Sequence, residues 1–329
     1  MHYTLKRIGM FLITMLLVSF LTFLAFELVS GDPVRTMLGT EATPDQIAAL
    51  QHELGLDLPF LTRYFRWLAG FFSGNLGVSY SYRQPVWDLI ASKLEITLWL
   101  SLMSFVLITV ISIPFGIFSY RWVGGPMDGL RTAFNQLCMA VPPFFTGILV
   151  SWIFGIILRF FVPGAFPGLR QDFGGALKYL FFGAICLSIP RIAMTVRMMR
   201  ATVIEEMNKA YVRTAISRGN DRRAVLTGHV LKNSMVSVVT FLGQTLAELV
   251  GAGIVVEQVL GIPGLWRFLV TSISHRDYPV VQAIVVILAF WVVLAGTLAD
   301  RDHIFYHVLN LACSGEHRAF PFRHAAGGV

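Results

Sequence analysis

The sequence predicts an all-α protein that crosses a membrane several times, on three observations: its composition, its long apolar runs and its basic connecting segments. Hydrophobic residues make up 55% of the 329 residues and charged residues only 14%, with a mean hydropathy of +0.67. A soluble domain carries about 25% charged residues, so the deficit indicates lipid as the main solvent. The net charge of +7 comes from bases between apolar runs. That pattern is typical of membrane topology rather than of nucleic-acid binding.

Each predicted span is an apolar run long enough for a bilayer. A hydrocarbon core of ~30 Å requires about 20 helical residues. Six runs qualify, at residues 8–29, 97–119, 134–161, 178–196, 236–256 and 279–299. The first follows Lys6 and Arg7 as a signal peptide would, but its apolar core is too long and no small-residue cleavage site follows. We therefore expect an uncleaved first helix.

Basic residues orient the spans. Lys6 and Arg7 place the N-terminus in the cytoplasm, which also places the arginine-rich segment 197–232 there and segment 30–94 outside. The expected organisation is a first helix with a periplasmic amphipathic region (1–96), a core membrane domain (97–299) and an unstructured tail (300–329). The cysteines Cys138, Cys186 and Cys313 stand far apart and have no metal or disulfide spacing.

The external segment contains two predicted helices. Thr43 is a good N-cap, Pro44 suits the first helical position, and Gly55 ends the run. A second, amphipathic helix follows within 61–71, where Trp and Tyr suit the membrane interface. We expect a small periplasmic cap on the bundle that carries no chemistry.

The most informative motif lies in the basic cytoplasmic segment. A short helical pattern over 211–218 stops at Gly219, and Asn220 and Asp221 lead into another helix. Gly219 supplies the φ > 0 that a tight turn needs, and Ala215 keeps one face small enough for a partner surface to approach. This predicts a helix–turn–helix outside the membrane.

This segment resembles the coupling motif of binding-protein-dependent ABC permeases, in the form found in dipeptide, oligopeptide and nickel permeases. The spacing from Arg213-Thr214-Ala215 to Gly219 matches that motif. Further matches run in order through residues 43–47, 54–57, 64–68, 74–77, 113–116, 142–144, 257–265 and 276–282. The chain departs from the family pattern where Ser237 and Glu95 replace prolines and where the tail after Asp300 begins.

The resemblance implies a permease subunit of an ATP-driven importer in the bacterial inner membrane, with peptides as the first expected substrate. Its partners would be a second permease, two ATPases and a periplasmic solute-binding protein. The expected ATPase-coupling residues are Arg213, Thr214, Ala215, Arg218, Gly219 and Asn220. The chain has no Gly-Lys pair and hence no phosphate loop, so ATP and Mg are expected on the ATPases and no cofactor on this chain.

Polar residues inside spans are costly and often functional. Gln244, Thr245 and Glu248 in the fifth predicted span are pathway candidates, with hydrogen bonding to a neighbouring helix as the alternative. Arg191 is expected to snorkel toward the cytoplasm. The loop with Gly261, Pro263 and Gly264 either lines the outer mouth beneath the binding protein or is simply a turn.

Other function classes remain open. A secondary transporter driven by an ion gradient would want paired intramembrane charges and internal repeats, and only Glu248 and Arg191 are candidates for such charges. A membrane metalloprotease would need a His-Glu-x-x-His motif, which neither His229 nor His275 supplies. Within the permease family, nickel, glutathione and opine-like solutes are alternatives to peptides.

Overall fold

Long apolar helices build the protein. The computed structural model describes residues 2–28, 34, 38–39 and 42–299, in which the secondary structure is helical apart from an isolated bridge between Val78 and Pro85. The helices long and apolar enough to cross a membrane lie within α1 (His2–Leu28), α5 (Val86–Tyr120), α8 (Phe173–Met207), α11 (Leu231–Leu260) and α13 (Tyr278–Ala299). The predicted all-α, multi-span class is confirmed. The predicted tail, including Cys313, lies outside the described residues.

The third predicted span, 134–161, is bent: its two halves pass the test of length and hydropathy only together, as a broken span or a re-entrant loop. It is divided between α6 (Asp128–Ala140) and α7 (Pro143–Val150), and the π-helix η1 (Ser151–Ile157) continues α7. The two halves meet at 93°. Val141 and Pro142 are both extended, because a residue before proline is driven out of the helical region and Pro142 precedes Pro143. The bend follows from this Val-Pro-Pro sequence.

Several helices extend beyond their apolar runs. Helices α5 and α8 have 35 residues each, so each is about 52 Å long, well beyond a hydrocarbon core of ~30 Å. Both continue through an internal proline, Pro114 in α5 and Pro190 in α8. Helix α11 continues a helical run that starts at Arg222 with α10 (Arg222–Val225) and η2 (Leu226–Val230). These extensions carry the chain to surfaces on both sides of the membrane.

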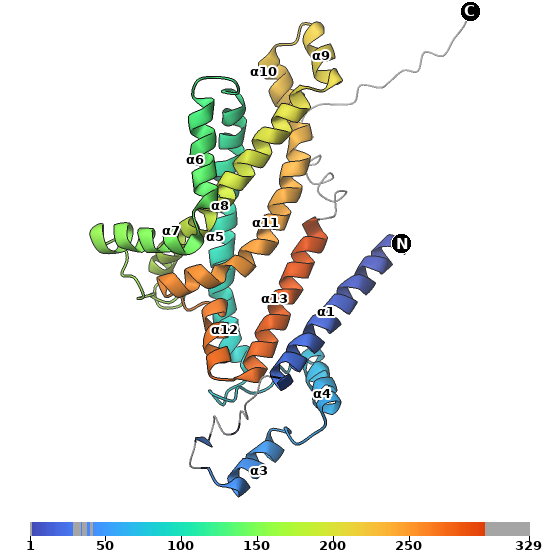
Figure 1. Ribbon diagram of the computed structural model, residues 1–329, viewed down its shortest axis with the longest axis vertical. Helices are drawn as coiled ribbons and strands as arrows, with labels where there is room; N and C mark the ends of the chain where they lie inside the picture. The colour runs from blue at the N-terminus through green and yellow to red at the C-terminus, as the bar shows by residue number, and fades with distance from the viewer. Residues whose placement is uncertain (1, 29–33, 35–37, 40–41, 300–329) are drawn as a thin grey trace, which may run out of the picture.

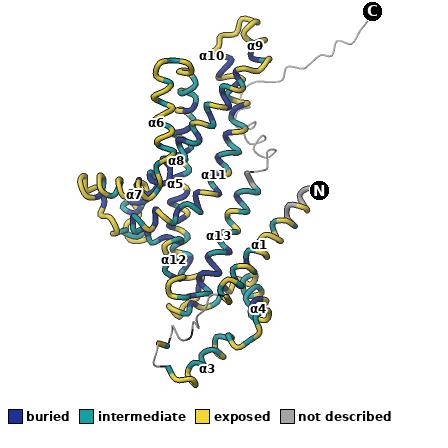
Figure 2. The backbone as a smooth tube through the Cα atoms, in the orientation of Figure 1, coloured by how far each residue is buried: buried dark blue, intermediate teal, exposed yellow. Residues whose placement is uncertain are grey.

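The core lies where α5, α8 and α11 pack together (Figure 2). Its fully buried side chains include Leu100, Tyr179 and Leu249. Small residues bring the backbones close, since a Cβ at Gly116 of α5 would collide with Met199 of α8. Ser188 of α8 donates to the carbonyl of Ser104 in α5 at 3.2 Å. This close packing fixes α8, from which segment 208–221 emerges.

The connecting helices lie at opposite ends of the molecule (Figure 1). At one end are α3 (Pro44–Glu53), α4 (Phe60–Phe72) and α12 (Leu265–Ser274), and at the other are α9 (Ala210–Ser217) and α10. The predicted start of α3 is confirmed by a capping box between Thr43 and Gln46. Helix α4 rests on α1 through the buried Tyr64, whose hydroxyl lies 3.0 Å from that of Ser19.

Candidate functional site

The predicted helix–turn–helix is present as an elbow, residues 210–225, at one tip of the molecule (Figure 1). Helix α9 ends at Ser217, and Gly219 adopts φ = +90°, the left-handed conformation that glycine tolerates best. The backbone N–H of Gly219 donates to Ile216 at 2.9 Å. The side-chain amide of Asn220 donates to the carbonyl of Ala215 at 3.1 Å. Asp221 then caps α10 by accepting from the N–H of Arg223.

The elbow is anchored by a few buried side chains. Val212 on α9 and Val225 on α10 are each 1% exposed and belong to the main core. Tyr211 donates to the carboxylate of Glu206 at 2.9 Å and accepts from Asn233 of α11 at 3.2 Å. Arg222 donates to the hydroxyl of Tyr120, the last residue of α5, at 3.1 Å. The elbow therefore contacts the ends of α5, α8 and α11.

Most predicted coupling residues share the outer surface of this elbow. Arg213, Thr214, Arg218, Gly219 and Asn220 are exposed. Ala215 differs, because it is half-buried and packs against the core of its own chain. A Cβ at Gly219 would meet nothing within 4 Å, so the tip is open for contact.

The three pathway candidates do not share one face. Gln244 and Glu248 are exposed one helical turn apart on α11, as predicted. Thr245 is 1% exposed and donates within its own helix to Phe241 at 2.9 Å. Arg191 does not extend to the cytoplasmic end as predicted, because its guanidinium forms an ion pair with Glu248 across the α8–α11 packing.

The outward face of α11 is polar over the apolar span. Beyond Asn233, the exposed residues of α11 follow a spacing of three, four or seven, which places them on one side of a helix. They are Ser237, Gln244, Glu248, Val255 and Gln258. We call these five residues the polar face of α11. A helix whose exposed side is polar at membrane depth needs water or protein beside it rather than acyl chains.

The loop after α11 is a tight turn around a buried carboxylate. Gly261 ends α11 with φ = +69°, and a Cβ at Gly264 would collide with the side chain of Glu257. Glu257 is fully buried, accepts from the hydroxyl of Thr97 at 2.6 Å, and accepts from the backbone N–H of Arg267 in α12 at 3.0 Å. Pro263 lies between these glycines. This supports the turn interpretation, and Gly264 acts here by making room for Glu257.

A second buried carboxylate, which sequence reasoning missed, holds the loop before α5. Asp277 is fully buried, and its oxygens accept from the hydroxyl of Ser79 at 2.5 Å and from the N–H of Tyr80 at 3.0 Å. In the sequence, Asp277 belongs to the matched stretch 276–282 and directly precedes the Tyr-Pro that begins α13, but neither feature indicates that it is buried. Within the described residues no group of three or more His, Cys, Asp or Glu side chains could hold a metal ion.

Comparison with known proteins agrees with this architecture. The family described as "Binding-protein-dependent transport system inner membrane component" matches residues 112–303, and its N-terminal domain matches residues 1–102. A relative from Sinorhizobium fredii, named "Probable peptide ABC transporter permease protein y4tP", is 30% identical over 91% of this chain and 95% of its own length. The glutathione transport system permease protein GsiC of Escherichia coli is 31% identical over 95% of this chain and 98% of its own length. The chain therefore belongs to the binding-protein-dependent family and is a membrane-spanning permease subunit of an ABC importer.

Proposed function

We propose that this permease moves peptides and that the elbow, residues 210–225, is where an ATPase subunit docks. One observation carries the coupling proposal: an exposed, glycine-tipped helical turn stands outside the spans and is tied by hydrogen bonds to the ends of α5 and α8. Arg213 and Arg218 on its outer surface are suited to acids on the ATPase. Closure of two ATPases would then move the elbow and the attached spans as rigid bodies between inward-open and outward-open states.

The arrangement of the helices also supports an N-terminus inside the cell. The N-terminal end of α1, the α5–α6 turn and the elbow all point toward one end of the molecule, while α3 and α4 lie at the other (Figure 1). Lys6, Arg121 and the elbow arginines are thereby on one side, as the positive-inside rule requires for the cytoplasm. The protein would lie in the bacterial inner membrane, with α3 and α4 in the periplasm.

The polar face of α11, together with Arg191, is the proposed wall of the solute pathway. Its ion pair is accessible from one side, since Glu248 keeps 54% and Arg191 24% of its side-chain surface exposed. Intramembrane charges of this kind face a water-filled space or another protein chain. A second permease subunit, facing this one across the pathway, would supply the opposite wall. Thr245, which is buried, would only pack α11 against its neighbours.

The working unit would contain two permeases, two ATPases and a periplasmic solute-binding protein. ATP and Mg would bind to the ATPases, because this chain has no phosphate loop. The peptide substrate is supported by the printed name of the Sinorhizobium relative. Glutathione is the second candidate, since the Escherichia coli relative carries that name and glutathione is itself a small peptide.

Replacing Gly219 with Trp tests the docking role. Any L residue at φ = +90° is strained by about 1–2 kcal/mol, and an indole would project from the open tip into the space of a partner. We expect normal membrane insertion but loss of ATPase co-purification and of peptide-stimulated ATP hydrolysis.

Two further variants separate the effect of backbone strain at Gly219 from the effect of side-chain bulk. Gly219→Ala adds the backbone strain without the bulk and should retain most co-purification. Gly228→Trp is the matched control, because Gly228 is exposed, has no positive φ, and a Cβ there also meets nothing within 4 Å. Normal assembly and uptake with Gly219→Trp would refute docking at the elbow.

A further inference from the structure

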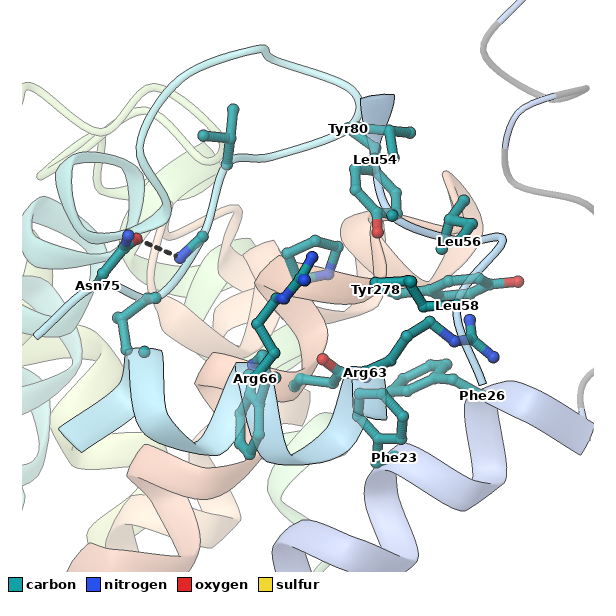
Figure 3. Close-up of a pocket in the computed structure, with 18 of the residues that line it drawn as sticks. Phe23, Phe26, Leu54, Leu56, Leu58, Arg63, Arg66, Asn75, Tyr80 and Tyr278 are labelled. Carbon is teal, nitrogen blue, oxygen red and sulfur yellow. Dashed lines mark hydrogen bonds between the residues drawn. The ribbon is translucent and has the colours of Figure 1, made fainter. Parts of the chain in front are cut away.

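A cavity of about 630 Å³ lies at the outer end of the molecule, away from the elbow (Figure 3). Helices α1 and α4, the end of α3, the loop before α5 and the start of α13 enclose it. Its volume falls in the range of small-molecule sites, about 300–1,000 Å³. Phe23 and Phe26 of α1 and Trp67 of α4 give it an apolar side. None of the proposed coupling or pathway residues lines this cavity.

Two buried hydrogen-bond donors on its wall lack an acceptor. The Nε of Arg63 and the Nε1 of Trp67 are both inaccessible and make no hydrogen bond, and both side chains line the cavity. The Nη2 of Arg63 donates to both carboxylate oxygens of Glu27 at 2.6 Å. A buried donor left without a partner is destabilising, so native proteins rarely retain one. Both atoms are inaccessible, so a molecule in the cavity cannot reach them, and its acceptors must meet other donors on the wall.

Two other groups, Arg66 and Tyr80, are available as hydrogen-bond donors to a molecule in the cavity. Arg66, one turn along α4 from Arg63, has no ion pair or hydrogen bond within the part of the chain that the structure describes. Figure 3 shows that Arg66 and Tyr80 enter the cavity from opposite sides. Burial first, and the charge of Asp277 second, raise the pKa of Tyr80 to about 12, so this phenol keeps its proton at physiological pH. Guanidinium and phenol groups together favour an oxyanion.

The position of the cavity relative to the membrane indicates which oxyanion it would bind. Glu27 stands at the outer end of the apolar run Gly9–Leu28, which is where phospholipid headgroups begin. Helix α4 exposes Leu61, Phe65 and Phe72, as expected for a helix at that interface. Glu53 also lines the cavity, is exposed, and has no ion pair among the described residues, so it suits an ammonium group.

We propose that this cavity binds the headgroup of a membrane phospholipid, with the phosphate accepting from Arg66 and from the hydroxyl of Tyr80. A headgroup that also carries an ammonium, such as ethanolamine, would place that charge toward Glu53. The bound lipid would join the periplasmic helices α3 and α4 to the outer ends of α1 and α13. The carboxylate of a transported peptide has related chemistry, and the experiment distinguishes the two sources.

The test uses the whole assembled transporter, purified in detergent and stripped of lipid. Melting temperature and bound mass, the latter by native mass spectrometry, are measured after adding phosphatidylethanolamine, a diacylglycerol with the same chains, or a dipeptide. We expect the phospholipid to bind and raise the melting temperature, and the diacylglycerol, which lacks the phosphate, to do neither. No difference between these two lipids would overturn the proposal. A dipeptide effect that Arg66→Gln abolishes, with no phospholipid effect, would also overturn it and assign the cavity to the substrate.

Two variants locate the site. Arg66→Gln should weaken phospholipid binding by about tenfold or more, because charge-assisted hydrogen bonds to phosphate are lost. Tyr80→Phe should reduce the rise in melting temperature that phospholipid causes, because it removes the phenol donor. Trp87→Phe and Arg170→Gln, at exposed residues outside the cavity, are controls. Wild-type phospholipid binding by both cavity variants would contradict the proposal.

Discussion

The outward faces of α1 and α11 are opposites, although both helices pass the same test of length and hydropathy. Between residues 10 and 25 of α1, every exposed residue is apolar except Thr14, whose hydroxyl donates to the carbonyl of Met10 in the same helix. On the polar face of α11 every member except Val255 is polar, and one is a paired charge. Mean hydropathy therefore identifies a span but does not tell what its exposed side touches.

Because one exposed face is apolar and the other polar, we expect α1 and α11 to contact different surroundings. Acyl chains can lie against a helix face only where no polar group needs a partner, and the exposed Met10, Ile13 and Leu17 of α1 meet that condition. The polar face of α11 fails it, since unpaired polar groups in hydrocarbon are costly. We infer lipid beside α1 and water or a second permease beside α11.

The largest expected effect comes from placing the same charge on each face. Leu17→Arg puts a guanidinium on the lipid side of α1, near the middle of its span, where insertion costs about 2.5–3.5 kcal/mol. Gln244→Arg puts it on the polar face of α11, where water or protein already surrounds polar groups. We expect Leu17→Arg to reduce the amount of membrane-inserted permease and Gln244→Arg to leave it near wild type, as measured by carbonate extraction and quantitative immunoblotting.

Ile13→Arg and Ser237→Arg repeat the comparison at a second exposed position on each helix. Equal losses on the two helices would mean that both faces meet lipid. That outcome would remove the reason for placing the pathway beside α11.

A smaller effect is expected from breaking the ion pair. Glu248→Leu leaves the Arg191 guanidinium without its partner, which we expect to cost about 1–3 kcal/mol because the pair is only partly buried. The double variant Arg191→Leu/Glu248→Leu removes both charges and should recover most of that stability. If the pair lines the pathway, peptide uptake should stay low in the double variant although its melting temperature recovers.

Uptake that recovers together with stability would show that the pair only packs α8 against α11. Thr245→Val is the matched control on the same helix, because Thr245 is buried and bonds only within α11. It should change uptake little.

Much of the architecture follows from local sequence. Apolar length places the spans, the Val141-Pro142-Pro143 sequence explains the bend, and Gly219 marks the turn of the elbow. These features depend on the backbone conformations that a few adjacent residues allow. Apolar length alone treats 134–161 as one run, but the adjacent prolines at 142 and 143 indicate that the run is bent.

Features that depend on how helices rotate against one another could not be predicted. Arg191 and Glu248 are candidates for paired charges, but whether they meet depends on how α8 packs against α11. Thr245 differs from Gln244 only by a rotation of about 100° on α11. The burial of Glu257 depends on Thr97, far away in sequence. Asp277 and the donor-lined cavity arise in the same way, from segments that meet only in the folded chain.

The most direct test of the polar face is cysteine accessibility in the assembled transporter. Cys138, Cys186 and Cys313 are first replaced by Ser, and single cysteines are then placed at Gln244 or Ser237 on α11 and at Ile13 or Leu17 on α1. In membranes, a small charged thiol reagent should label the α11 positions, and bound ATP should change the labelling rate as the pathway opens and closes. The α1 positions should stay unlabelled. Labelling of α1, or α11 positions that are inert in every nucleotide state, would contradict the assignment of the pathway to α11.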